Sequence, residues 1–156
     1  MFLIDKYKPN SVSNVFKKFR KQLGSELFSK LFEIILTDNG WEFSKPEDIE
    51  VDSLTGEKLI NVFYCDPYSS WQKGGIERNY EFIRYIIPKG ITFDKLTKEN
   101  IMDMMNNINN VSRRSLEYKT PYELFKNIYG DEITKKLHLI ALEKDEVNLS
   151  YKLLIK

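Results

Sequence analysis

The sequence of 156 residues predicts an α/β fold. Two short aliphatic runs, residues 33–36 and 59–65, each stop at turn-forming residues that include an acid, as buried strands of α/β sheets do. Apolar residues at helical spacing precede the first run, over 12–23, and follow the second, over 76–87 and 101–111. Strands that alternate with helices indicate an α/β sheet, and such a sheet places its site at the carboxyl ends of its strands.

The first forty residues are expected to form strand, helix and strand, with a right-handed crossover. Residues 2–4 have the pattern of the end of a strand. Asn10 or Ser11 is suited to cap a helix with a continuous apolar stripe, and Gly24 is expected to end that helix. A shorter amphipathic segment follows, and the chain then enters the strand that ends just before Asp38.

A polar region separates the two predicted strands. Residues 44–56 are rich in turn-forming residues, which predicts a loop with one helical turn at 47–49. Residues 59–65 form the second strand, which an Asp-Pro pair ends, and we expect it to lie beside the first. The loop over 68–75 consists of aromatic, amide and glycine residues, a composition that suits close approach to a ligand.

The remainder of the chain is predicted to be helical. A helix over 75–87 ends at Pro88, and a second helix covers 97–111. Thr120 starts a third helix with a cap, a proline and a glutamate at the favoured positions, and Gly130 ends it. The residues of the first of these helices that are expected to face the core are Ile76, Tyr80, Ile83 and Ile87.

Composition limits the function classes. The single cysteine, Cys65, excludes an internal disulfide framework and fits a reducing compartment, so a cytoplasmic protein is expected. No run of about 18 apolar residues occurs, which predicts no membrane span. The one histidine, His138, has no partner motif for a triad or a zinc site and is interpreted as structural. A net charge of +1 means that any contact with nucleic acid relies on local basic clusters.

Several separated motifs occur in the order found in one family. Residues 37–43 read Thr-Asp-Asn-Gly-Trp-Glu-Phe, and residues 66–69 read Asp-Pro-Tyr-Ser. Glu77 opens the next helix, and Pro-Lys-Gly follows that helix at 88–90. Over about residues 1–125 the chain thus resembles the catalytic core of bacterial insertion-sequence transposases of the DDE integrase-core superfamily, and it is most similar to insertion-sequence family thirty.

The resemblance implies a fold. The family has a ribonuclease-H-like core, and only one partial strand precedes the first helix in this sequence. The expected architecture is therefore a truncated ribonuclease-H-like fold that lacks its first strands, followed by carboxyl-terminal helices. On this interpretation residues 1–95 are a partial catalytic core, residues 96–156 are a helical extension packed on it, and the chain is a carboxyl-terminal fragment.

The resemblance also implies a chemistry. Asp38 matches the second acid of the family and Glu77 the third, so both are candidate catalytic residues and candidate ligands of Mg²⁺ or Mn²⁺. Two such ions, held by carboxylates, stabilise the attacking and leaving oxygens when a phosphodiester is cut or joined. Asp5 stands at the wrong place for the first acid and is interpreted as a loop acid. The isolated chain is therefore expected to be a weak or inactive enzyme.

The implied partners are DNA, both insertion-sequence ends and target, and other protein chains. A homo-oligomer or pairing with full-length transposase is expected, and no membrane partner. Aromatic side chains can stack on bases, and basic or amide side chains can contact phosphates. On these grounds the candidate DNA-binding residues are Trp71, Gln72, Lys73, Arg78, Asn79, Arg113 and Arg114.

Two alternatives remain open at this point. A non-catalytic transposase remnant would act only through protein or DNA binding. An unrelated metal-dependent hydrolase would use Asp38, Asp66 and Glu77, which would make Asp66 essential. Around the acids, Asn39 and Gly40 are expected to shape the turn, with Gly40 supplying backbone freedom.

Overall fold

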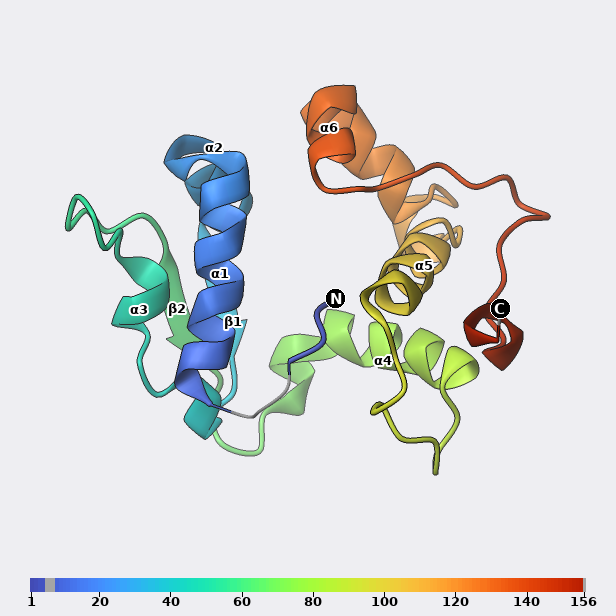
Figure 1. The fold of residues 1–156 in the computed structure, drawn as a ribbon, viewed down its shortest axis with the longest axis horizontal. Helices are drawn as coiled ribbons and strands as arrows, with labels where there is room; N and C mark the ends of the chain where they lie inside the picture. Colours follow the sequence, from blue (N-terminus) through green and yellow to red (C-terminus); the bar gives the residue numbers. More distant parts are fainter. Residues whose placement is uncertain (5–7, 156) are drawn as a thin grey trace. The chain divides into compact units, whose positions relative to one another are not determined.

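The computed structural model describes residues 1–4 and 8–155, and they form two compact units (Figure 1). The sheet unit comprises residues 4–74, and the helical unit comprises residues 75–156 together with 1–3. Each unit is described by itself. Asp5 lies outside the described residues, and the assignment of residues 1–95 and 96–156 as domains stays a prediction.

Two helices open the sheet unit. Helix α1, Pro9–Leu23, is followed by α2, Ser25–Leu31, as the apolar pattern predicts. Gly24 ends α1 with a φ of 82°, a conformation that glycine adopts without steric cost. The predicted caps are wrong, because the helix begins earlier: Pro9 supplies the first turn, and Lys8 precedes it without a side-chain cap.

The sheet consists of two parallel strands in the part of the chain that the structure describes. Strand β1, Ile34–Thr37, pairs with β2, Asn61–Tyr64. The short helix α3, Glu47–Glu50, lies between them in sequence. The neighbouring position of the two strands and the helical turn before β2 are confirmed. The strand expected at residues 2–4 is wrong, because the described residues 1–4 form no strand and the sheet stops at β1 and β2.

The core of this unit lies on one face of the sheet. Phe28, Ile49 and Ile60 are completely or almost completely buried, and Phe16 and Phe19 of α1 and Phe32, which follows α2, pack against them. The expectation of fully buried strands is wrong, because side chains alternate between the faces of a strand. Ile34 and Phe63 point to the other face and are 64% and 53% exposed. The fold is therefore mixed α/β, with a small sheet that is covered on one side.

A buried arginine connects α1 to the turn after α3. Arg20 donates a hydrogen bond to the carbonyl oxygen of Val51 (2.9 Å), lies 3.8 Å from a carboxylate oxygen of Asp52, and stacks over the Phe28 ring. The pKa of Asp52 is lowered, first by the backbone N–H of Leu54 and then by the Ser25 hydroxyl and the Arg20 charge. Asp52 thus contributes to stability in its ionised form.

Helices and turns make up the helical unit. Its helices are α4, Gly74–Ile86, α5, Lys98–Asn109, and α6, Pro121–Lys136. Thr97 and Thr120 cap α5 and α6 with complete capping boxes, which confirms the start predicted from the Thr120 motif. Among the residues that the structure describes, no helix is both long enough and apolar enough to cross a membrane.

The core of the helical unit is built from the second half of α4 and from α5. Ile86, Ile87 and Met104 are buried there, and the 3₁₀ turn Tyr151–Leu154 packs on α5. The prediction that the whole stripe of α4 faces the core is wrong for its first half. Tyr80 is 61% exposed, because only the later turns of α4 join this apolar cluster.

Asparagine side chains of α5 and of its C-cap residue, Asn110, hold the segment after α6. Gly130 breaks α6 with a non-helical φ of 80°, and the chain returns along α5. The Asn106 amide bonds the carbonyl of His138 and the N–H of Ile140, and the Asn110 amide bonds the carbonyl of Ile140 and the N–H of Leu142. These two amides therefore pair with residues 138–142 as the backbone of a neighbouring strand would.

We expect Asp52→Asn to lower stability at neutral pH but not in acid. Because the folded-state pKa of Asp52 lies below that of the unfolded chain, its stabilisation is present above about pH 4 and is lost as the pH falls through the folded value. Thermal melting, followed by circular dichroism from pH 2 to pH 7, should show that the melting temperatures of the native chain and of Asp52→Asn become equal at the acid end. A constant difference in melting temperature would contradict this account.

We expect Asn110→Ala to destabilise the carboxyl-terminal segment by about 2–4 kcal/mol, because it leaves two partly buried backbone groups without partners. Amide hydrogen exchange at Ile140 and Leu142 should accelerate accordingly. Asn109→Ala is the matched control, since Asn109 makes neither of these hydrogen bonds. Equal effects of the two substitutions would show that the amide pairing contributes nothing specific.

Candidate active site

Asp38 and Asp66 lie at the same edge of the sheet. The backbone N–H of Cys65 donates a hydrogen bond of 2.7 Å to the carbonyl of Thr37, which extends the pairing of β1 with β2 by one residue. Asp38 directly follows β1, and Asp66 follows β2 after Cys65. The parallel register therefore brings both acids to the carboxyl edge, which is where the sequence predicts the site.

The carboxylate of Asp38 is paired with an ammonium group. Lys73 Nζ lies 3.0 Å from Asp38 Oδ2. The Asp38 side chain is 63% exposed, whereas that of Lys73 is only 23% exposed, so the lysine is the more firmly packed partner. The hydrogen bond and charge of Lys73 lower the pKa of Asp38, with further help from the backbone N–H of Gly40.

A glutamine closes the loop that carries Lys73. Gln72 Oε1 accepts a hydrogen bond from the backbone N–H of Asp66 (3.0 Å), and Gln72 Nε2 donates one to Asp66 Oδ2 (2.9 Å). Inside the loop, the N–H of Ser69 bonds the carbonyl of Asp66, and the N–H of Gln72 bonds that of Ser69. The 3₁₀ turn Ser70–Lys73 then presents Lys73 to Asp38.

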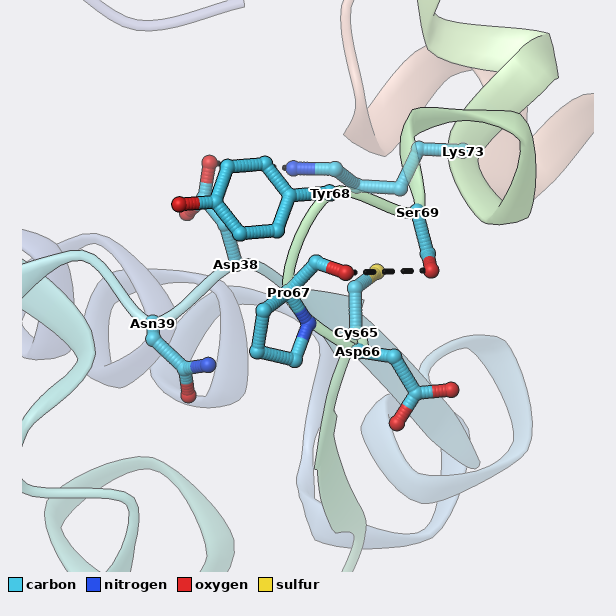
Figure 2. Close-up of a pocket in the computed structure, with 8 residues that line it drawn as sticks. All are labelled: Asp38, Asn39, Cys65, Asp66, Pro67, Tyr68, Ser69 and Lys73. Atoms are coloured by element: carbon cyan, nitrogen blue, oxygen red, sulfur yellow. Dashed lines mark hydrogen bonds and ion pairs between the residues drawn. The ribbon is translucent and has the colours of Figure 1, made fainter.

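An open pocket of about 670 Å³ lies over this edge of the sheet. Figure 2 shows the Lys73 side chain extended toward Asp38, and the carboxylates of Asp38 and Asp66 pointing away from each other. Tyr68 is fully exposed and has a φ of 59°, a left-handed conformation that costs a non-glycine residue about 1 kcal/mol or more. The pocket is lined by Asp38, Asn39, Cys65, Asp66, Pro67, Tyr68, Ser69 and Lys73.

The turn after Asp38 differs from the prediction in one respect. Gly40 has a φ of −63°, which any residue can adopt, so backbone freedom is not the reason for a glycine there. A Cβ atom at this position would come within 2.6 Å of Glu42 Oε2, the end of a flexible side chain that can move away. The chain continues into the 3₁₀ turn Trp41–Phe43, in which Trp41 is 63% exposed.

Glu77 belongs to the helical unit. It is exposed in the first turn of α4, where a shallow groove is lined by Glu77, Tyr80, Glu81, Arg84 and Tyr85. A carboxylate in the first turn of a helix is favoured by the positive end of the helix dipole. Asp38 and Glu77 are thus each accessible within their own unit, and their joint role stays a prediction.

The predicted DNA-binding residues of the helical unit have different surroundings. Arg113 donates a hydrogen bond to Asn79 Oδ1 (3.0 Å) and stacks over the Phe82 ring, 5.3 Å from its centre. Burial lowers the pKa of Arg113, and the charge of Arg78 adds to this effect. Arg113 and Asn79 therefore connect α4 to the turn after α5, whereas Arg78 and Arg114 are exposed. DNA binding by all four residues stays a prediction.

The donor chemistry at Asp38 suits a hard cation. Carboxylate oxygens are the preferred ligands of Mg²⁺ and Mn²⁺, and the bound ammonium of Lys73 shows that this carboxylate accepts a cation. Among the described residues of either unit, no group of three or more histidine, cysteine, aspartate or glutamate side chains is placed to hold a metal ion. Asp38 would therefore need additional ligands.

The sequence predicts DNA contacts for Lys73 and Gln72. In the structure these side chains bond Asp38 and Asp66 and organise the loop, and the residue pattern alone carries no signal for those bonds. The proline after Asp66 was a usable signal for the turn itself, because it ends the strand and starts a turn that must close. Tyr68 lines the pocket and belongs to the loop that the sequence predicts to approach a ligand.

Comparison with known proteins identifies relatives over part of the chain. The transposase for insertion sequence element IS4351 of Bacteroides fragilis is 41% identical over 99 residues, 63% of this chain and 28% of that protein. Transposase InsI for IS30A of Escherichia coli K12 is 32% identical over 98 residues, 63% of this chain and 24% of that protein. ORF3 of Spiroplasma virus SpV1-R8A2 B, which carries the word integrase in its name, is 30% identical over 120 residues, 77% of this chain and 36% of that protein.

These matches confirm the resemblance to insertion-sequence transposases, the IS30 family included. The matched segments span about a quarter to a third of the length of these curated relatives. No family model matches the chain, and no solved structure matches it.

We expect Gln72→Ala to release the loop, because it removes both hydrogen bonds to Asp66. Each of the two hydrogen bonds contributes about 1 kcal/mol, and the Asp66 N–H loses its acceptor when Gln72 is removed. Hydrogen exchange at the Asp66 amide should therefore accelerate about tenfold or more. Asn39→Ala, which removes an amide from the same pocket, should leave that exchange rate unchanged. An unchanged rate in Gln72→Ala would show that the loop is held by other contacts.

Proposed function

We propose that this chain, a relative of insertion-sequence transposases, contributes to a metal-dependent centre that cleaves DNA strands and transfers them during transposition. The observation that carries the proposal is the position of Asp38. It follows β1 at the carboxyl edge of a parallel strand pair, within a motif that resembles the family's second acid. The parallel pair with its flanking helix α1 is compatible with a ribonuclease-H-like core, which we also propose.

Asp38 and Glu77 are the residues that would hold Mg²⁺ or Mn²⁺. Such ions would stabilise the charge on the attacking and leaving oxygens of a phosphodiester. Both carboxylates are exposed, so metal ions bound to them would be accessible to the phosphates of a molecule as large as DNA. Exposed Trp71, Arg78 and Arg114 would contact the bases and the backbone around the reacting phosphate.

The proposed centre needs a carboxylate beyond these two. Among the residues that line the pocket, the other acid is Asp66, whose carboxylate points away and is bonded by Gln72. A further acid would come from another segment or another chain, either a second copy or a full-length transposase. We therefore propose that these 156 residues alone have weak or no activity. Action on chromosomal DNA would place the protein in the cytoplasm.

The second candidate function is non-catalytic. Asp38 is neutralised by Lys73, as would suit a protein that binds DNA or a transposase without cutting. The unrelated-hydrolase hypothesis has less support, because its required Asp66 is held by Gln72 and the curated relatives are transposases. The two remaining functions differ in one testable respect, namely whether Asp38 and Glu77 are needed for chemistry.

A segment exchange tests the proposal. The 99 residues matched in the IS4351 transposase are replaced by those of this chain, and transposition of a marker between IS4351 ends is counted. We expect the chimera to transpose, and Asp38→Asn or Glu77→Gln to reduce the frequency at least about 100-fold, because each substitution removes a charged ligand of a cooperative centre.

Matched substitutions accompany these two variants. Asp66→Asn retains an oxygen that can accept the Gln72 hydrogen bond, and Glu81→Gln removes an acid one turn beyond Glu77, so both should transpose nearly normally. A strong loss in Asp66→Asn would favour the hydrolase-type ligand set. A folded, DNA-binding chimera that never transposes would favour the non-catalytic function.

A further inference from the structure

We propose that helix α1 presents a binding surface for the phosphate backbone of duplex DNA, and that the ammonium groups of Lys17, Lys18 and Lys21 make its contacts. These three residues are called the lysine stripe below. The described residues that line the pocket at the sheet edge include none of α1. The inference therefore goes beyond the proposed metal-dependent centre and does not depend on Asp38 or Glu77.

Helical periodicity places the lysine stripe on one face of α1. Asn14, Lys17, Lys18 and Lys21 follow the spacing i, i+3, i+4 and i+7, and all four residues are exposed. The apolar residues of the same helix pack against the core of the sheet unit. The stripe therefore lies on the solvent side of α1 and is accessible along its length.

Positive charge in the sheet unit is concentrated on this helix. Residues 4–74 contain ten lysine and arginine residues and eleven aspartate and glutamate residues. Four of the ten basic residues lie in α1, which contains no acid, whereas α3 carries Glu47, Asp48 and Glu50. A polyanion is attracted to α1 and repelled by α3, so the charge distribution also orients it.

The lysine stripe has no acidic partner to neutralise it. None of its three ammonium groups forms an ion pair within residues 1–4 and 8–155, whereas Lys126 and Lys136 of α6 lie 2.8 Å and 2.9 Å from carboxylate oxygens. Lys17 and Lys21 are one turn apart, and like charges at that spacing repel. The helix dipole favours Lys21 in the last turn, but it does not explain Lys17 and Lys18. A row of bound phosphates would relieve the repulsion.

The chemistry of the stripe fits a phosphate backbone better than a protein or a lipid surface. Protein interfaces have an apolar or aromatic centre, and none of the large hydrophobic side chains of α1 is exposed. A helix that binds a lipid surface inserts its apolar face, whereas the apolar face of α1 is packed in the core. Lysine and asparagine side chains contact phosphates without reading bases, so the binding should be independent of DNA sequence.

The length of the stripe suits successive phosphates of one strand. Lys17 and Lys21 are separated by four residues, which is about 6 Å along the helix axis, and the phosphates of one DNA strand follow each other every 3.4 Å or so along the duplex axis. The flexible lysine stems can adjust to this spacing. Three phosphate contacts are therefore expected.

The first test measures binding of the full chain to a short DNA duplex at several salt concentrations, by fluorescence anisotropy. The stripe variant (Lys17→Gln, Lys18→Gln, Lys21→Gln) should reduce the slope of log affinity against log salt by about 3, because each phosphate contact contributes about 0.9. Glutamine has nearly the helix propensity of lysine, so α1 should still form. The matched control removes three exposed lysines outside α1 and should keep the native slope: Lys30→Gln, Lys45→Gln and Lys144→Gln.

The comparison of variants decides this test. A reduced slope confined to the stripe variant supports the proposal, and Asp38→Asn should bind DNA no more weakly than the native chain. Equal reductions in the stripe and control variants overturn the proposal, as does a native chain that binds no DNA. Polyglutamate and phosphatidylserine vesicles represent an acidic protein and a lipid surface. If either binds the native chain as tightly as DNA does, and loses that binding in the stripe variant, the assignment to nucleic acid is overturned.

The second test uses the native chain and needs no substitution, so it holds even if the stripe variant fails to fold. Lysines are acetylated with and without bound duplex, and mass spectrometry measures the rate at each position. DNA should slow acetylation of the lysine stripe severalfold and leave the rates of Lys30 and Lys45 unchanged. Unchanged acetylation of the stripe while DNA is bound would overturn the proposal.

Discussion

The parallel pairing of β1 with β2 is the constraint on which the candidate site depends. Its last hydrogen bond, from Cys65 to Thr37, fixes the positions of the two acids that follow the strands. A shift of one residue would turn every side chain of a strand to the opposite face. It would expose Ile35 and Val62, which pack on the core, and it would carry Asp38 away from Lys73.

Local chemistry explains most of what could be predicted of the fold. Gly24 and Gly130 end helices at left-handed or non-helical positions, and the Thr120 motif starts one, because these signals act within a few residues. The limits of burial were not predictable in the same way. Whether Ile34 or Tyr80 is covered depends on which distant segment packs against it, and the apolar pattern of a strand or helix carries no information about that partner.

The same distinction applies to the site. Motif order and strand ends were sufficient to place Asp38 and Asp66 at the ends of two neighbouring strands. The identity of the Lys73 partner, and the bonds of Gln72, depend on how a seven-residue loop closes in three dimensions. Arg113 shows the same limit. Its charge is visible in the sequence, but its stacking on Phe82 and its hydrogen bond to Asn79 are contacts between residues far apart in the chain, which the sequence pattern does not predict.

The parallel register also has a kinetic consequence. Ile34 and Asn61 are direct partners, yet they lie 27 positions apart in the sequence, so the chain must close a long loop before the strands can pair. Helices α1 and α2 need only local contacts and can form earlier. The pocket edge should therefore be the last part of the sheet unit to assemble during folding, and, because two strands alone are marginally stable, the first to be lost on heating.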